Sequence, residues 1–284
     1  MAIGDLNPGY MGTANITGIG NFRFQDSSLA VTQEVNAPDL VMGDWDHDAW
    51  NYGPITVGGS LSGPMTENFA ANGAWNWAYL RNASNCGGLE SKDVELYYFC
   101  NRGGAAVNNS RTFNGMLVNS LQISCSAGDV ATFSMDLLGV GASAWGAGTP
   151  QRNTTSEKLL TWDKVSVSVV GPGGGGNVNY SNFDVTIGNN LEAQYALSQA
   201  DLFPFDIVPG MRSITGTLTV YNVDGGTNNT SWDDYLASDV ATITINLNGS
   251  PIQFYAALHR IQPSQNPNVI TSTLGFTGVT SQPQ

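Results

Sequence analysis

The stretch that decides the fold is residues 119–141, NSLQISCSAGDVATFSMDLLGVG. In its first half, the apolar residues Leu121, Ile123 and Cys125 alternate with polar ones. Residues 127–129, Ala-Gly-Asp, supply a turn, after which the alternation restarts. Its second apolar series is Ala131, Phe133, Met135 and Leu137. Because successive side chains of a strand point to opposite faces, this pattern predicts a β-hairpin with one dry and one wet face.

Alternation of the same kind recurs along most of the chain. The further predicted strands are 94–100, 162–170, 183–187, 191–197, 214–220, 241–247, 252–256 and 270–279. Asn248-Gly249 lies between two of them and predicts a second tight hairpin. We expect loops at 85–93, 102–111 and 142–157, and an extended connection bounded by proline at 201–210. The pattern indicates a mainly β protein of β-sandwich or barrel-like architecture.

Two helices are expected within this β framework. Thr66 is a helix N-cap candidate with Glu67 in the first turn, and apolar residues then recur at helical spacing, which predicts an amphipathic helix over 67–82. Ser231 predicts the start of a second, short helix, with Asp233 and Asp234 where the helix dipole favours anions.

The composition excludes several functions. Charged residues make up 12% of the chain, about half the usual share. The net charge of −13 leaves no basic footprint for gripping nucleic acid. Neither a signal peptide nor a membrane span is predicted. The three cysteines, Cys86, Cys100 and Cys125, have no metal-binding spacing and are interpreted as buried thiols of a reducing cytoplasm.

Two short motifs resemble ligand sites but lack essential parts. Asp44, Asp46 and Asp48 have the spacing that opens a calcium loop, yet Ala49 and Ile55 stand where that loop needs glycine and glutamate. A solvated acidic turn is the favoured interpretation. Residues 171–176, GPGGGG, follow a strand, but no helix follows them to hold a pyrophosphate. We predict no metal and no cofactor.

No catalytic motif stands out either. His47 and His259 lie far apart in the sequence and in different contexts. The pair Asp233 and Asp234 could in principle serve glycoside hydrolysis, but adjacent acids at a helix start are typically caps. A hydrolase is therefore the weakest of the functional hypotheses, and we predict that the protein is not an enzyme.

Aromatic residues leave one alternative open. Trp45, Trp50, Trp75, Trp77 and Tyr79 could form a stacking platform for sugars, as in carbohydrate-binding or host-adhesion modules. The same residues are typical of a core or a subunit interface, which is the interpretation that we favour.

The two halves of the chain follow a similar order. Gly59-Ser60-Leu61 and Gly216-Thr217-Leu218 each precede a predicted helix and a hairpin, and the halves end on 131–141 and 270–280. The chain is thus either two tandem copies of one β unit or a single larger one. We predict an N-terminal arm or hairpin at 1–52 and β units at 53–170 and 171–284.

Several stretches together are similar to the major tail proteins, or tail tube proteins, of tailed bacteriophages and related prophages. They are 18–24, Pro38-Asp39 with Gly43 and Asp44, Gly53-Pro54 before 57–59, 115–124 with 127–129, Leu138-Gly139, Asn190-Leu191, Pro209-Gly210 and 214–216. The resemblance covers most of the chain.

This resemblance implies a structural subunit whose sheets join across copies into rings. Rings stack into a hollow tube in the virion tail, made with other tail proteins in the host cytoplasm, and DNA passes through without being bound. If the two halves are copies, three chains give a ring of six quasi-equivalent β units; otherwise a ring of six chains is expected. An acidic bore suits the net charge of −13. The segments 1–52, 83–93 and 142–157 are expected to contact the next ring.

Overall fold

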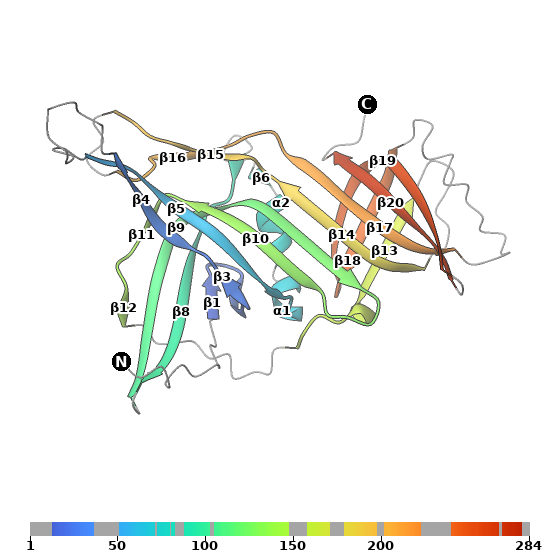
Figure 1. The fold of residues 1–284 in the computed structure, drawn as a ribbon, viewed down its shortest axis with the longest axis horizontal. Coiled ribbons are helices and arrows are strands. Elements are labelled where there is room, and N and C mark those ends of the chain that lie inside the picture. Colours follow the sequence, from blue (N-terminus) through green and yellow to red (C-terminus); the bar gives the residue numbers. More distant parts are fainter. Residues whose placement is uncertain are drawn as a thin grey trace, which may run out of the picture.

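The computed structural model describes residues 13–36, 51–71, 73–79, 81–82, 88–102, 105–147, 158–170, 179–197, 202–222, 240–266 and 269–279. In these residues the protein is mainly β, as predicted, and a 16-stranded sheet dominates it (Figure 1). All of its strand pairs are antiparallel.

The strands of the first half are β1 (Thr13–Ile16), β2 (Gly20–Arg23), β3 (Asp26–Ser27), β4 (Ala30–Asn36), β5 (Asn51–Pro64), β6 (Arg81–Asn82), β7 (Gly88–Leu89), β8 (Lys92–Arg102), β9 (Ala105–Ser126), β10 (Thr132–Gly139), β11 (Gly141–Ala142) and β12 (Gly146–Ala147). Those of the second half are β13 (Val165–Val170), β14 (Tyr180–Gly188), β15 (Leu191–Gln194), β16 (Asp206–Pro209), β17 (Ser213–Asn222), β18 (Val240–Leu247), β19 (Ser250–Asn266) and β20 (Val269–Val279). Two α-helices, α1 (Glu67–Ala71) and α2 (Ala74–Tyr79), and a 3-10 helix, η2 (Trp162–Lys164), complete the described elements.

The predicted central hairpin is confirmed as β9 and β10. Leu121 lies opposite Met135 and Ile123 opposite Phe133, and all four side chains are buried. Thr132 and Ser124, which also pair, lie on the other face. The second predicted hairpin is confirmed as well, because Asn248 and Gly249 turn with positive φ between β18 and β19.

Two sets of six strands have the same pairing order. The first set pairs as β1-β8-β9-β10-β5-β4 and the second as β13-β18-β19-β20-β17-β14. Numbered along the chain within each set, both orders read 1-4-5-6-3-2. The sets meet where β14 pairs with β9, so that one sheet runs through both.

The first predicted helix is interrupted. Thr66 caps α1, because its Oγ1 accepts a hydrogen bond from the Phe69 N–H at 3.2 Å. The continuous helix expected over 67–82 is wrong, since α1 ends at Ala71 and α2 begins at Ala74. Gly73 between them has a φ of +79°, a left-handed conformation that ends a helical run. The second predicted helix, at Ser231, lies outside the described residues.

Some predicted loops are strands. Residues 105–111, expected as loop, form the first part of β9 and pair with β8. Part of 85–93 forms β7 and the start of β8, and 141–142 and 146–147 form β11 and β12 on the edge of β9. Conversely, 162–164 is a 3-10 turn rather than the start of a strand.

The core lies between the dry face of the sheet and the helices. Phe133 of β10 packs against Phe69 of α1, with ring centroids 4.7 Å apart, and Phe22 of β2 packs on both rings. Ala14 and Ile16 of β1 are fully buried in the same cluster. The N-terminal strands therefore contribute to the common core.

Candidate functional site

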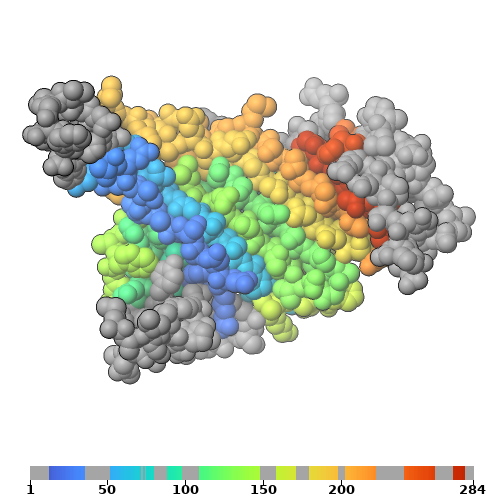
Figure 2. Space-filling view, viewed as in Figure 1, coloured from blue at the N-terminus to red at the C-terminus, as the bar shows by residue number. Residues whose placement is uncertain are grey.

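The opposite face of the sheet is polar over most of its width. At one end, Leu117 and Leu138 of this face pack with Ile207 of β16 and Leu89 of β7. The face runs across β5, β10, β9, β14, β17 and β20, which lie next to one another in the sheet. Figure 2 shows β5, β10, β9, β14 and β17 as neighbouring bands from blue through green and yellow to orange across the front of the molecule. Side chains of this face, as the strand registers align them, are Thr56, Ser60, Ser62, Thr132, Ser134, Asp136, Ser120, Gln122, Ser124, Ser126, Asn182, Asp184, Thr186, Thr215, Thr217, Thr219, Thr273 and Thr277. We call this surface the wet face.

Hydrogen bonds join neighbouring strands across the wet face. Ser120 Oγ donates to Asp136 Oδ2 at 2.6 Å, and the hydroxyls of Ser124 and Thr132 are 2.9 Å apart. Where the two strand sets meet, Gln122 Nε2 donates to Asp184 Oδ2 at 2.7 Å. The face is therefore a rigid polar surface, with short side chains that are held in place by their neighbours.

The charge on the wet face is negative. The charged side chains on this face of the six strands are Asp136 and Asp184, and the strands place no lysine or arginine there. A surface with few cations and fixed carboxylates repels phosphate groups rather than binding them. Short hydroxyl and amide side chains also leave no long flexible group to hold a passing polymer.

A second surface is apolar and lies at one end of the sheet. We call β15, β16 and the described residues around them, 190–197 and 202–211, the distal arm. It lies beside the outer part of β5, because the Ile55 N–H donates to the Leu202 carbonyl at 2.8 Å and the Tyr195 hydroxyl to the Ile55 carbonyl at 3.2 Å. Its exposed apolar side chains are Tyr195, Leu197, Leu202, Phe205, Val208 and Met211. Leu197 is 98% exposed and Met211 is 87% exposed.

One buried asparagine fixes the root of the distal arm. Asn189 is fully buried, and its Nδ2 donates to the carbonyls of Ala78 and Val118 at 3.0 and 2.9 Å. Its Oδ1 accepts from Arg212 Nε at 3.0 Å. The guanidinium of Arg212 also lies 5.1 Å from the centroid of the Tyr79 ring. Asn189 thus ties α2, β9 and both ends of the arm together.

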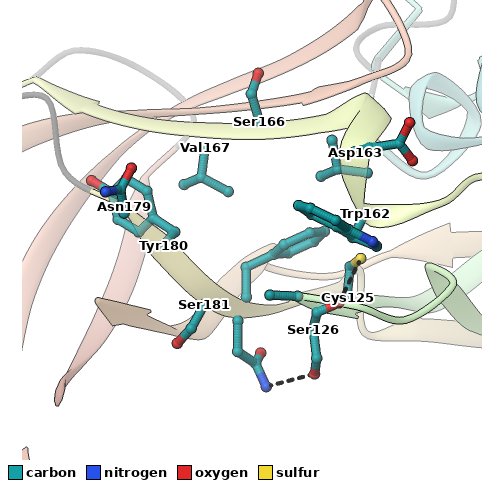
Figure 3. A pocket seen from close by; sticks show the side chains of 13 residues that line it. Cys125, Ser126, Trp162, Asp163, Ser166, Val167, Asn179, Tyr180 and Ser181 are labelled. Carbon is teal, nitrogen blue, oxygen red and sulfur yellow. Dashed lines mark hydrogen bonds between the residues drawn. The ribbon is translucent and has the colours of Figure 1, made fainter. Parts of the chain in front are cut away.

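A pocket of about 290 Å³ lies between β13 and β14 (Figure 3). Trp162 and Val167 line one side, and Tyr180 and Cys125 line the other. Its wall includes one carboxylate, Asp163, and no histidine. This lining lacks the paired groups that hydrolysis requires.

Cys125 lies at the floor of that pocket as a free, buried thiol. Burial raises the pKa of the Cys125 thiol, and the nearby negative charge of Asp129 raises it further. The thiol is therefore protonated near neutral pH, which makes it a poor nucleophile. Its predicted burial is confirmed. Cys86 and the side chain of Cys100 lie outside the part of the chain that the structure describes.

The structure buries Trp75 and Trp77, the two described tryptophans of the alternative sugar platform. Trp75 and Trp77 are 5% and 2% exposed, and Trp77 Nε1 donates to the Glu90 carbonyl at 2.8 Å. Tyr79 stacks on Trp75, with ring centroids 4.9 Å apart. Their burial favours the interpretation as core. Trp45 and Trp50 lie outside the described residues.

The other candidate ligand and catalytic groups are mostly outside the described residues as well: Asp44, Asp46, Asp48, His47, Asp233, Asp234 and 171–176. His259 is exposed on β19. In the part of the chain that the structure describes, no group of histidine, cysteine and acidic side chains is placed to hold a metal ion. None of the helices described there has the length and apolar character of a membrane span.

Sequence reasoning missed the distal arm. Of the connection expected to be extended at 201–210, Asp206–Pro209 forms β16. The exposure of Phe205 and Met211 depends on which strand lies beside them. The wet face was visible as alternation, whereas its width depends on the order in which the strands pair. A run of hydrophobic residues in a proline-bounded connection, 202–208, was the available signal for the arm.

Fold and surfaces together give a mainly β protein with a wide sheet, one largely polar face and an exposed apolar arm. A family model for the phage tail tube protein matches residues 3–278, and the chain therefore belongs to the phage tail tube protein family. Comparison with curated proteins gave no match. A tail tube protein is a structural component of the virion tail, which assembles with itself and with other tail proteins.

Proposed function

We propose that this chain forms closed rings that stack into the tube of a phage tail, and that the wet face lines the bore through which DNA passes. The observation that carries this proposal is the wet face itself, a polar surface across six strands whose charged groups are Asp136 and Asp184. Such a lining lets a polyanion slide without being held. On this proposal the protein catalyses no reaction, and it assembles in the host cytoplasm.

We propose a ring of three chains. The repeated 1-4-5-6-3-2 pairing order supports two β units in each chain, so three chains would supply six quasi-equivalent units. In this arrangement β1 to β4 belong to the first unit. The division of the sequence at 53 and 171 stays a prediction, as does the alternative ring of six chains.

The distal arm supports a role in stacking. Six apolar side chains of this short arm are exposed, among them Leu197, Phe205 and Met211, and such a concentration on one segment is typical of an interaction surface. We therefore assign to the arm a contact with the next ring. Changing Leu197 and Met211 to serine is expected to leave single rings that do not stack, whereas changing the exposed Thr217 and Thr277 of the wet face to serine leaves stacking intact.

Electron microscopy of the purified full chain tests the ring. We expect rings with a central pore, stacked into tubes of uniform bore, and native mass spectrometry is expected to give three times the chain mass of 30.0 kDa. Six chains per ring would overturn the trimer but not the tube. Dispersed monomers at every concentration, above all monomers that bind glycans, would overturn the proposal and favour the carbohydrate-binding alternative.

Charge reversal tests which face lines the bore. The variant Asp136→Lys with Asp184→Lys places two cations on the wet face, and the control Asp129→Lys with Asp163→Lys makes the same charge change at exposed positions outside the wet face and the distal arm. Tubes of the first variant are expected to retain DNA fragments at low salt and to release them as salt rises, because phosphate binding is salt-dependent. Equal retention by both variants would mean that the wet face is not the lining.

A further inference from the structure

Within one chain, the two strand sets are joined by the pairing of β14 with β9, the internal joint. β14 pairs with β17 on one side and with β9 on the other, from Asn182 opposite Ser126 to Gly188 opposite Ser120. On the dry side, Phe183, Val185 and Ile187 meet Cys125, Ile123 and Leu121, and all six are buried. Side-chain bonds on the wet side reinforce the joint. β14 is the second strand of its set and β9 is the fifth strand of the other.

The opposite pair is the second strand of the first set and the fifth strand of the second set. Within the residues that the structure describes, each has an edge with no partner strand. Among the described strands, β3 and β4 pair only with β5. Within the described ranges, the part of β19 from Arg260 to Asn266 pairs only with β20. These edges belong to opposite ends of the sheet, far apart in Figure 1, so one chain cannot join them. Unpaired edges of this length are template surfaces for another strand.

The two fifth strands match in detail. β9 has a bulge between the partners of Asp136 and Leu137, and β19 has one between the partners of Gly275 and Phe276. Leu121 lies opposite Met135, as Ile261 lies opposite Leu274. A bulge redirects a strand at a defined residue, so its presence at the same place makes β19 past Leu258 the counterpart of β9 past Val118.

The second strands match through their common neighbours. Gly59 of β5 lies opposite Leu137, and Gly216 of β17 lies opposite Phe276, which aligns β5 with β17. Val31 pairs with Val57 in the first set, and Ile187 pairs with Ile214 in the second. β3 and β4 together are thus the counterpart of β14.

We propose that β3 and β4 of one copy pair antiparallel with the 260–266 segment of β19 in a second copy, in the register of the internal joint. This inference rests on the proposed ring and identifies the strands that close it. Carrying the internal register over places Val31 opposite Ile261, Ala30 opposite Gln262 and Thr32 opposite Arg260. Each copy then uses its β3/β4 edge toward one neighbour and its 260–266 edge toward the other. Such head-to-tail contacts form a closed ring when the rotation between copies divides a full turn.

Proline makes this joint weaker than its internal counterpart. The N–H of Ala127, just past the end of β9, donates to the carbonyl of Ser181 in β14 at 2.8 Å. The odd-numbered residues at this end of β9 therefore direct their backbone N–H and C=O groups toward the joint. Pro263 takes the place of Ile123 in this alignment. It has no N–H, a loss that edge strands tolerate. The joint between copies therefore has one hydrogen bond fewer than the joint within a chain.

Disulfide trapping in the assembled full chain tests the proposed register. Ala30→Cys with Gln262→Cys, and Thr32→Cys with Arg260→Cys, are directly opposed non-hydrogen-bonded positions, for which Cα atoms lie about 4.5 Å apart. The control, Ala30→Cys with Asn266→Cys, uses the same strands about 13 Å out of register. The single variants, which retain the native cysteines, provide the background.

Oxidised rings of either in-register pair are expected to give a covalent ladder that ends at the ring size. Its yield should exceed that of the out-of-register control by about tenfold or more, because a disulfide forms only over a narrow range of Cα separations. Rings that assemble but crosslink no better than the control would overturn this joint and leave the tube proposal standing. Monomers that neither assemble nor crosslink would overturn both.

Discussion

The two faces of β10 differ completely in what they contribute. Phe133, Met135 and Leu137 are at most 3% exposed, whereas Thr132 and Asp136, between and beside them, are exposed. Burial of apolar area contributes about 25 cal/mol per Å², so the dry face carries most of the stabilisation. Exposed hydrogen bonds such as that of Ser120 to Asp136 contribute little net free energy. Side chains of the wet face can therefore change at little cost in stability, so their chemistry can suit what this surface contacts after assembly.

Phe133→Ala is expected to break the dry face. Its ring packs against Phe69 and Phe22, and truncation leaves a cavity that the sheet and helix cannot close. We expect a loss of about 3 to 5 kcal/mol in the free energy of unfolding. Urea unfolding measures it, at one protein concentration for all variants, because assembly adds to the apparent stability.

Ser134→Ala is the matched control, one residue away on the wet face. It is expected to change the free energy of unfolding by less than about 0.5 kcal/mol, as substitutions on exposed surfaces usually do. Comparable losses in the two variants would refute the division of labour between the faces.

Asn189→Ala sharpens the comparison, because this residue is a polar group on the dry side. It removes the donors to Ala78 and Val118 and the acceptor for Arg212, and leaves buried polar groups without those partners. We expect a loss of about 2 to 4 kcal/mol. The exposed Asn182, whose Nδ2 donates to Ser126 at 3.2 Å, provides the control Asn182→Ala. The role assigned to Asn189 would be wrong if the two variants unfolded at the same urea concentration.

The dry and wet faces could be predicted from the sequence because strand periodicity is local. The alternation around Leu121 and Phe133 predicts which side chains share a face, and this does not depend on which strand lies alongside. The choice of neighbours is not local. β9 pairs with β10 eight residues away along the chain, from Ser124 to Thr132, but also with β14, from Gln122 to Thr186. Nothing in either strand specifies the second pairing, and so the extent of the wet face could not be predicted.

Two predictions from the sequence, the continuous helix over 67–82 and the loop at 105–111, are wrong for similar physical reasons. The spacing of Phe69 and Trp77 suits one helix, but Gly73 between them adopts a positive φ that propensity alone does not reveal. Residues 105–111 are rich in asparagine, which predicts a loop, yet β8 lies beside them and supplies hydrogen-bond partners. Tertiary pairing overrides local preference in this case.

Gln122→Ala tests the wet face where the two strand sets join. The bond of Gln122 to Asp184 is short, at 2.7 Å, but exposed, so solvent replaces much of it. We expect a loss of about 0.5 to 1 kcal/mol. Ser124→Ala, which removes a bond within the first strand set, is expected to lose a similar amount. A much larger effect of Gln122→Ala alone would mean that polar contacts hold the joint together and that its apolar side does not.

Cys125 offers the smallest effect and a test by pH. Burial raises the pKa of its thiol above the unfolded value of about 8.5, so the folded state binds the proton more tightly than the unfolded state does. The stability due to this thiol is therefore fully present below pH 8.5 and is lost as the pH rises through the folded pKa, by at most about 1.4 kcal/mol per pH unit.

Cys125→Ala should lack this loss. The difference in unfolding free energy between wild type and Cys125→Ala, measured with reductant from pH 7 to pH 9.5, is expected to shrink above pH 8.5. For Ser124→Ala, whose side chain lies on the wet face and does not titrate, the corresponding difference should stay constant. A constant difference for Cys125→Ala as well would mean that the thiol is open to solvent, and that the dry face does not extend to this edge of the pocket.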